Sequence, residues 1–108
     1  MKLPNLENAL VEDQKITEYL LSDENSGGKS AFFLAFGFTV SHPQAMRDAL
    51  LAHTKEHPVA QISETPHGIK VIIEGKMHTP DGRSPRIRSV WIINTGKDVP
   101  RLVTAYPL

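Results

Sequence analysis

Cysteine is absent from the 108 residues of this chain. The protein can therefore form no disulfide framework, thiolate zinc site, iron–sulfur cluster or cysteine nucleophile. Long apolar runs are absent too, so no segment is predicted to span a membrane, and the amino terminus lacks the apolar core of a secretory signal. These absences predict a soluble cytoplasmic protein. The length supports one modest hydrophobic core, which predicts a single domain over residues 1–108.

Net charge is also absent, because 12 Lys and Arg side chains balance 12 Asp and Glu side chains. This balance argues against a uniformly basic nucleic-acid-binding protein. The charges are nevertheless spread unevenly: residues 1–26 contain six acidic and two basic side chains, and residues 65–108 contain three acidic and seven basic ones. Such a contrast permits a basic face for a phosphate-rich partner, but an ordinary mixed surface would look the same in the sequence.

Helix signals come first along the chain and strand signals follow. Residues 13–22 and 29–37 predict two short helices, and a third is predicted to start near Pro43, within a capping-box pattern at Ser41, and to reach Glu56. After these helices, β-branched and aromatic residues predict strands at 59–63, 69–78, 86–94 and 102–106. This order predicts an α+β fold, with the helices packed on one face of a four-stranded antiparallel sheet.

The pair Asp81 and Gly82 is the clearest local signal, since it is typical of a two-residue hairpin turn. Such a turn sets Arg88 opposite Gly75 and, two residues away, brings Arg86 opposite Met77. Side chains alternate along a strand, so both arginines are predicted to continue the core face of the sheet toward the hairpin end.

The last strand brings further polar residues to the same place. If Leu102 joins the core face beside Ile92, then Thr104 neighbours Val90 and Tyr106 neighbours Arg88. The second helix would add Lys29 if it packs on that face. Arginine and lysine stabilise charge on phosphate oxygens, and tyrosine, lysine or histidine can exchange protons, so this group suits metal-free phosphodiester cleavage. In the alternative, purely structural interpretation, the same arginines form salt bridges and Tyr106 is a core residue.

Two other patterns contain residue types that bind phosphates or metals. Gly28, Lys29 and Ser30 look like the end of a phosphate-binding P-loop, but that motif requires glycine at position 23, which is aspartate. Nucleotide hydrolysis is therefore excluded, and either an anion-binding helix start or a plain one remains. His53 and His57 have a spacing that can hold a metal, yet no glutamate lies between them as in zinc proteases, so neither a metal nor another cofactor is predicted.

The sequence resembles a known bacterial domain family in both halves. The resemblance covers nearly the whole chain and is carried by residues 3–5, 15–21, 27–38, 75, 80–82, 90–93 and 98–106. Members of that family occur as small single proteins and as C-terminal domains of polymorphic and contact-dependent toxins. The domain is similar to the barnase–EndoU–colicin–RelE (BECR) superfamily of metal-independent ribonucleases, in which helices precede an antiparallel sheet.

The resemblance implies a toxin that cleaves RNA, for example a transfer RNA, by attack of a 2′-hydroxyl to leave a 2′,3′-cyclic phosphate. The implied catalytic residues are Lys29, Arg86, Arg88, Thr104 and Tyr106, and the implied substrate contacts are Gly28, His78 and Trp91. An acidic antitoxin or immunity protein is the implied partner. The alternative is a non-catalytic module that binds an anion or a protein. A pocket that gathers Lys29, Arg88, Thr104 and Tyr106 favours the enzyme, whereas arginines paired with Glu64 or Glu74 and a sealed Tyr106 favour the module.

Overall fold

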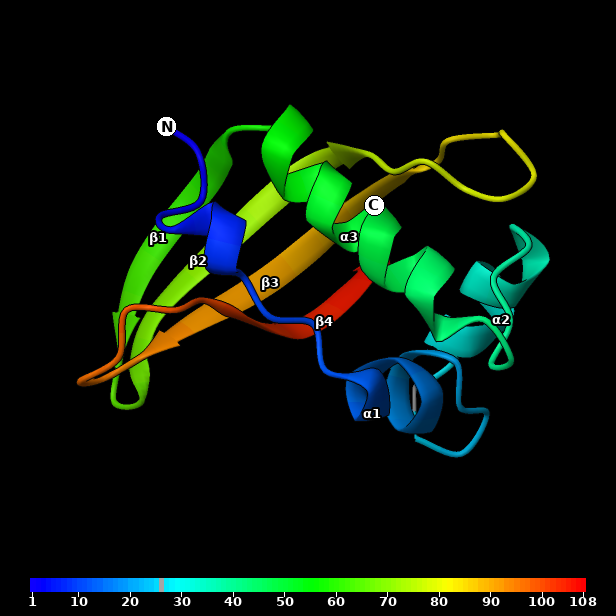
Figure 1. Cartoon of the computed structure of the whole chain (residues 1–108), viewed down its shortest axis with the longest axis horizontal. Helices are drawn as coiled ribbons and strands as arrows, with labels where there is room; N and C mark the ends of the chain where they lie inside the picture. Colours follow the sequence, from blue (N-terminus) through cyan, green and yellow to red (C-terminus); the bar gives the residue numbers. More distant parts are fainter. Residues whose placement is uncertain (26) are drawn as a thin grey trace.

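In a computed structural model that describes residues 1–25 and 27–108, helical segments precede four strands (Figure 1). The helical segments are η1 (Leu6–Asn8), α1 (Asp13–Lys15), η2 (Ile16–Leu20), α2 (Lys29–Ala35) and α3 (Pro43–Glu56). The strands are β1 (Val59–Thr65), β2 (Gly68–Lys76), β3 (Arg86–Asn94) and β4 (Arg101–Pro107). The strands form one antiparallel sheet in the order β1-β2-β3-β4, which confirms the predicted α+β class.

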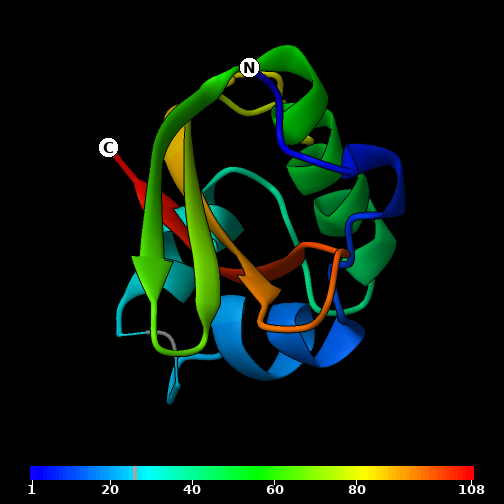
Figure 2. The same cartoon turned by 90° about the vertical axis from the view of Figure 1, so that its left-hand side faces the viewer.

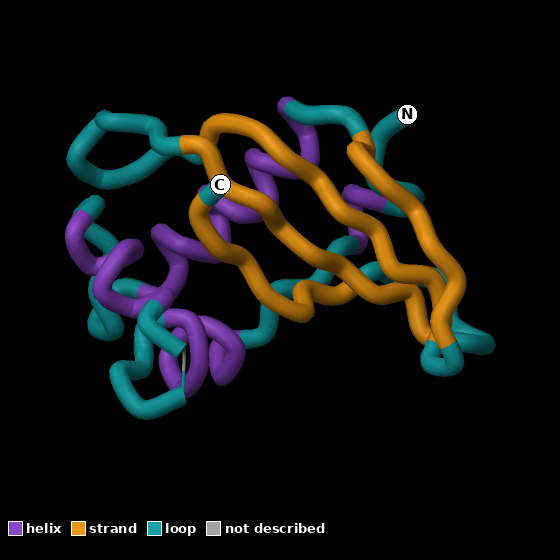
Figure 3. The backbone as a smooth tube through the Cα atoms, turned by 180° about the vertical axis from the view of Figure 1, so that it is seen from behind, coloured by secondary structure: helices purple, strands orange, loops and turns teal. Residues whose placement is uncertain are grey.

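Helix α3 covers one face of this sheet, as the views in Figures 1 and 2 agree. The buried core lies between them. Its sheet side includes Val71, Ile73, Ile87, Trp91 and Leu102, and its helix side includes Ile16, Leu20, Phe33, Met46 and Leu50. Burial of apolar surface is the main force that holds helices and sheet together. The opposite face of the sheet, called the outer face below, is turned to the viewer in Figure 3.

The pairing of β2 with β3 differs by one residue from the predicted one. Glu74, not Gly75, is opposite Arg88, and Lys76 is opposite Arg86. A shift of one residue transfers every side chain of a strand to the other face. Arg86 and Arg88 therefore lie on the outer face, and the prediction that they continue the core face is wrong.

The connection between β2 and β3 explains this shift. The strands separate after Lys76, and residues 77–85 form a wide loop whose base is closed by the Met77 amide, which donates to the Pro85 carbonyl at 2.9 Å. Proline has no amide hydrogen to continue the ladder, so Pro85 limits pairing on one side. The Asp81–Gly82 turn signal is thus part of a longer loop and does not set the register.

A bulge in β4 decides which residues of that strand face outward. Trp91 pairs with Leu102 and Val90 pairs with Thr104, so Val103 is the extra residue. Because of it, Leu102 enters the core while Thr104 and Tyr106 lie on the outer face. The predicted neighbours of Thr104 and Tyr106, namely Val90 and Arg88, are confirmed. The prediction that Leu102 lies beside Ile92 is wrong, because Leu102 is opposite Trp91 and Arg101 is opposite Ile92.

Two predicted helices differ from the structure in smaller ways. The first predicted helix is split, since the α-helical turn α1 continues as a π-helix at η2. The predicted capping box of α3 is wrong: His42 is the N-cap residue and makes no side-chain cap bond, while Ser41 Oγ lies 3.2 Å from His42 Nδ1.

Gly68, at the start of β2, cannot accept a side chain. Its φ is +141°, and a Cβ there would lie 2.2 Å from the Ile93 carbonyl oxygen. We expect Gly68→Ala to lower the free energy of unfolding by about 2–3 kcal/mol, because backbone must move to relieve the clash. Gly82→Ala is the control: its φ is also positive, but nothing lies within 4 Å, and the expected cost is about 1 kcal/mol. Urea denaturation of both variants measures the difference, and equal losses would contradict this account.

Candidate functional site

Basic side chains gather on the outer face of the sheet, the face turned to the viewer in Figure 3. The strand registers bring five of them there, Lys70, Lys76, Arg86, Arg88 and Arg101. Among the residues of the four strands, Glu74 is the one acidic side chain that the same registers turn to this face. The uneven charge of the sequence thus becomes a basic face, which favours polyanionic partners.

A groove of about 510 Å³ lies on this face. Its floor is apolar, since Val90 and Ile92 are only 5% and 8% exposed. Its walls are mainly polar and are formed by Thr65, His67, Lys70, Asn94, Arg101, Val103, Thr104 and Tyr106. A volume of this size is in the range of small-molecule sites in proteins.

Tyr106 separates the groove from a second hollow, of about 350 Å³. That hollow is lined by Gly27, Gly28, Lys29, Phe32, Tyr106 and Pro107. The turn before α2 therefore shares a hollow with Tyr106, which also lines the groove on the sheet. The two hollows together include the predicted residues Gly28, Lys29, Thr104 and Tyr106.

Arg88 joins this group through Tyr106. Its Nη1 donates to the Tyr106 hydroxyl at 3.2 Å, and its guanidinium carbon lies 5.7 Å from the centre of the Tyr106 ring. Its other edge is paired with Glu74: Nε donates to Oε2 at 2.7 Å, and Nη2 contacts the same oxygen. The bonds to Tyr106 and to Glu74 raise the pKa of Arg88 above its usual value, so the side chain stays cationic.

Tyr19 links Thr104 to two lysines. The hydroxyls of Tyr19 and Thr104 are 3.1 Å apart, and the Nζ atoms of Lys15 and Lys29 lie 5.1 and 5.4 Å from the Tyr19 ring centre. The hydrogen bond to Thr104, followed by the influence of Lys29 and Lys15, lowers the pKa of Tyr19. A tyrosine with a lowered pKa can exchange protons more readily near neutral pH.

The sequence interpretation missed Tyr19, His67, Lys70 and Arg101. Tyr19 and Thr104 are 85 positions apart, and no local pattern joins them. Lys70 and Arg101 would have been found with the correct strand register, since both lie opposite Ile92. His67 lies in the β1–β2 turn, where strand alternation does not apply, and it lines the same groove as Thr104 and Tyr106.

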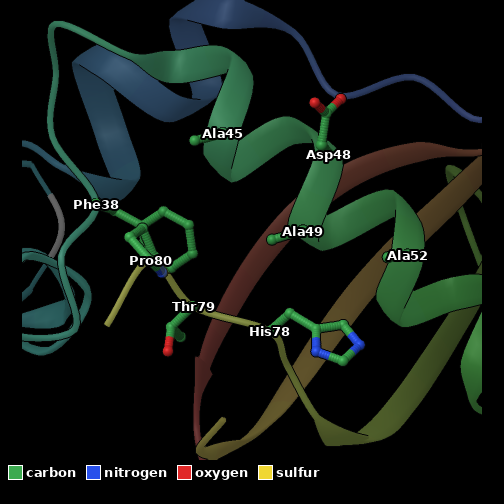
Figure 4. A pocket seen from close by; sticks show the side chains of 8 residues that line it. All are labelled: Phe38, Ala45, Asp48, Ala49, Ala52, His78, Thr79 and Pro80. Carbon is green, nitrogen blue, oxygen red and sulfur yellow. The ribbon is translucent and has the colours of Figure 1, made fainter. Parts of the chain in front are cut away.

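Besides Arg88, which touches the hollows only through Tyr106, three predicted residues lie outside them. Trp91 is fully buried on the helix-covered face, where its Nε1 donates to Ser89 Oγ at 2.9 Å, so it cannot contact a substrate. His78 lies across from Ala49 and Ala52 of α3 in another pocket (Figure 4), and its Nε2 is 2.9 Å from Glu56 Oε1. Arg86 is exposed beside Lys76 and has no side-chain partner in the described part of the chain.

His53 and His57, whose spacing can hold a metal, have other partners. The His53 ring contacts Ser89 and the Gly75 carbonyl, and His57 Nε2 donates to the Lys76 carbonyl at 2.7 Å. Within residues 1–25 and 27–108, no three His, Asp or Glu side chains are grouped so that they could hold a metal. No helix in that part of the chain has the length and apolar character needed to cross a membrane.

Comparison with known proteins identifies a sequence family and a likeness to solved structures. A sequence family described as Domain of unknown function (DUF6883) matches residues 2–108. No curated protein matches significantly. Among solved structures, the fold is similar to a chain from a contact-dependent growth inhibition toxin–immunity protein complex of Klebsiella pneumoniae 342, with a TM-score of 0.70 over 91% of this chain and 98% of that chain. The two sequences are 13% identical, so the likeness is one of fold.

Proposed function

The chain belongs to the DUF6883 family, and we propose that it is a toxin domain that cleaves RNA without a metal ion. The observation that carries the proposal is the meeting of Lys29, Thr104 and Tyr106 at two adjoining hollows, with Arg88 bonded to Tyr106. The hollows open on a face where five basic strand residues stand against one acidic residue. Such a face attracts the phosphates of RNA.

In the proposed reaction, the 2′-oxygen of one nucleotide attacks the adjacent phosphorus, and the bond from phosphorus to the 5′-oxygen breaks. One proton leaves the 2′-hydroxyl and one is added to the departing 5′-oxygen, which yields a 2′,3′-cyclic phosphate and a 5′-hydroxyl. Arg88 and Lys29 stabilise the charge that builds on the phosphate oxygens, with Arg86 as a further cation at the edge. Thr104 hydrogen-bonds a non-bridging oxygen, and Tyr106 positions or transfers a proton.

The toxin role is supported by the structural likeness. The matched chain comes from a complex of a toxin with an immunity protein. By analogy, we propose that this domain acts on cytoplasmic RNA, with transfer RNA as a candidate target, and that a cognate immunity protein or antitoxin restrains it. An acidic surface on that partner would complement the basic outer face.

The test is incubation of the purified, folded protein with total RNA in excess chelator. We expect cleavage to continue, because the proposed chemistry uses side chains alone, and we expect products with 2′,3′-cyclic phosphate and 5′-hydroxyl ends. Sequencing that selects for these ends identifies the RNA and the position cut. RNA that stays intact at high protein concentration, with the fold verified by circular dichroism, would exclude the ribonuclease.

A non-catalytic binding module is the second candidate. One observation favours it: Arg88 is paired with Glu74, the pairing expected of a structural arginine. Tyr106, in contrast, is half-buried and lines both hollows, as an enzyme would need. The chelator assay distinguishes the two candidates, because a binding module binds RNA or a protein partner but leaves the RNA intact.

A further inference from the structure

The floor of the larger groove is apolar although α3 does not cover this face. Val90 and Ile92 are nearly buried there, and Val103, the bulged residue of β4, forms part of the wall with 37% of its surface exposed. Such a floor does not suit a phosphate, because contact of a charge with apolar surface costs solvation free energy. It suits a flat, weakly polar ring, as a nucleobase is.

The rim supplies polar groups around that floor. Arg101 Nε donates to Asn94 Oδ1 at 2.9 Å, so a planar guanidinium and a planar amide are held together at one edge. Lys70 stands on the neighbouring strand, opposite Ile92. Within the described residues, neither Lys70 nor Arg101 has a carboxylate at ion-pair distance. Guanidinium and amide groups bind or stack on bases, and the cations attract the phosphates beside them.

Tyr106 connects the groove to the proposed cleavage centre. It lines the groove and accepts the hydrogen bond of Arg88 Nη1. A nucleotide whose phosphate lies at Arg88 and Tyr106 therefore has its base within reach of Val90 and Ile92. From this geometry we infer that the groove binds one unpaired nucleobase next to the cleaved phosphodiester. The inference rests on the proposed function for RNA as the ligand, and it restricts the substrate to single-stranded or loop RNA, because paired bases in a duplex stay stacked.

The experiment measures binding separately from cleavage. A 2′-O-methyl oligoribonucleotide without secondary structure has no free 2′-hydroxyl, so the wild-type protein binds it without cutting. We expect it to bind at least tenfold more tightly than the same strand in a full duplex. In an NMR titration with the oligonucleotide, the methyl signals of Val90, Ile92 and Val103 should shift, while those of Leu34 and Val40 should not.

Val103→Glu places a carboxylate in the wall of the groove at an exposed position where folding tolerates it. We expect it to weaken oligonucleotide binding at least tenfold. Val40→Glu is the matched control: Val40 is 53% exposed, lies outside the groove, and receives the same change of charge, so binding should stay within twofold. Both measurements are repeated at raised salt, which screens the long-range effect of the added charge but not its effect within the groove.

The outcomes separate this inference from the proposed function. Equal effects of Val103→Glu and Val40→Glu, methyl shifts outside the groove, or equal affinity for the duplex would overturn the base-binding groove even if RNA is cleaved. Groove-dependent binding without cleavage of natural RNA would keep the groove and overturn the ribonuclease. Absence of both binding and cleavage would overturn both.

Discussion

Alanine at both Arg88 and Tyr106 is expected to slow RNA cleavage by roughly 10³-fold while the protein stays folded. The two side chains act as one unit, since Arg88 Nη1 donates to the Tyr106 hydroxyl at 3.2 Å. Removing both takes away the cation that stabilises the phosphate charge and the hydroxyl that handles a proton. Neither side chain belongs to the buried core, so the loss should appear in the reaction rate and not in the stability.

Initial rates on a fluorescent oligoribonucleotide measure this effect, with thermal unfolding as the check on folding. Lys55→Ala is the matched control, because Lys55 is exposed on α3, which covers the opposite face of the sheet, and it lines neither hollow. It removes a positive charge and should change the rate by less than about threefold, in keeping with a solvated lysine away from the RNA. If expression of the wild type and of the double variant arrests growth equally, Arg88 and Tyr106 are not the catalytic centre.

Acidification from pH 7 to pH 4 is expected to cost the folded state about 3 kcal/mol through one residue, His53. Burial is the largest of the causes that lower the pKa of His53 from 6.5 to about 4. The unfolded chain therefore takes up a proton as the pH falls through 6.5, while the folded chain stays neutral until about pH 4. Stability present above pH 6.5 is lost progressively across this interval.

The hydrogen bonds around His53 also favour the neutral form of its ring. Nε2 lies 3.2 Å from the Gly75 carbonyl, which can only accept, so the ring carries its hydrogen on Nε2. Nδ1, 3.0 Å from Ser89 Oγ, then accepts from that hydroxyl, and Ser89 Oγ in turn accepts from Trp91 Nε1. A proton on Nδ1 would reverse the first of these bonds and leave the serine hydrogen without its acceptor.

Chemical denaturation at several pH values measures the acid sensitivity. His53→Gln can still donate to Gly75 but does not titrate, so its stability should change less between pH 7 and pH 4 than that of the wild type. His67→Gln is the control, because His67 is exposed and its removal should leave the pH dependence intact. An NMR titration of the wild-type His53 ring provides an independent value; a midpoint near 6.5 would refute the prediction even if His53→Gln does not fold.

Several features of the candidate site were accessible from the sequence. The proximity of Thr104 to Val90 and of Tyr106 to Arg88 was predicted correctly, although Leu102, from which the pairing was counted, lies opposite Trp91 and not beside Ile92. The bulge at Val103 offsets that difference of one residue. Lys29 was predicted to join these residues if the second helix packed on their face, and it lines a hollow with Gly28 and Tyr106. The face of the sheet on which Arg86 and Arg88 lie was predicted wrongly, because that prediction depended on the length of the β2–β3 loop.

His78 and Trp91 are two expected substrate contacts that lie away from the two hollows. Trp91 alternates with Val90 and Ile92, which are also apolar, so this part of β3 does not distinguish the buried face from the outer one. His78 lies in the loop after β2, where strand alternation no longer applies, and its position is set by Glu56 at the end of α3. Contacts with residues distant in the sequence therefore determine where both side chains lie.

The amino-acid sequence alone determined the class of fold and the order of its elements, because helix and strand periodicity and turn residues act over short stretches of chain. It also determined that basic residues follow the acidic ones. Only the tertiary structure decided the β2–β3 register, the bulge at Val103 and the contact of Tyr19 with Thr104, and hence the side of the sheet that carries the groove. These depend on packing between distant segments, where a shift of one residue exchanges the buried and exposed faces of a strand.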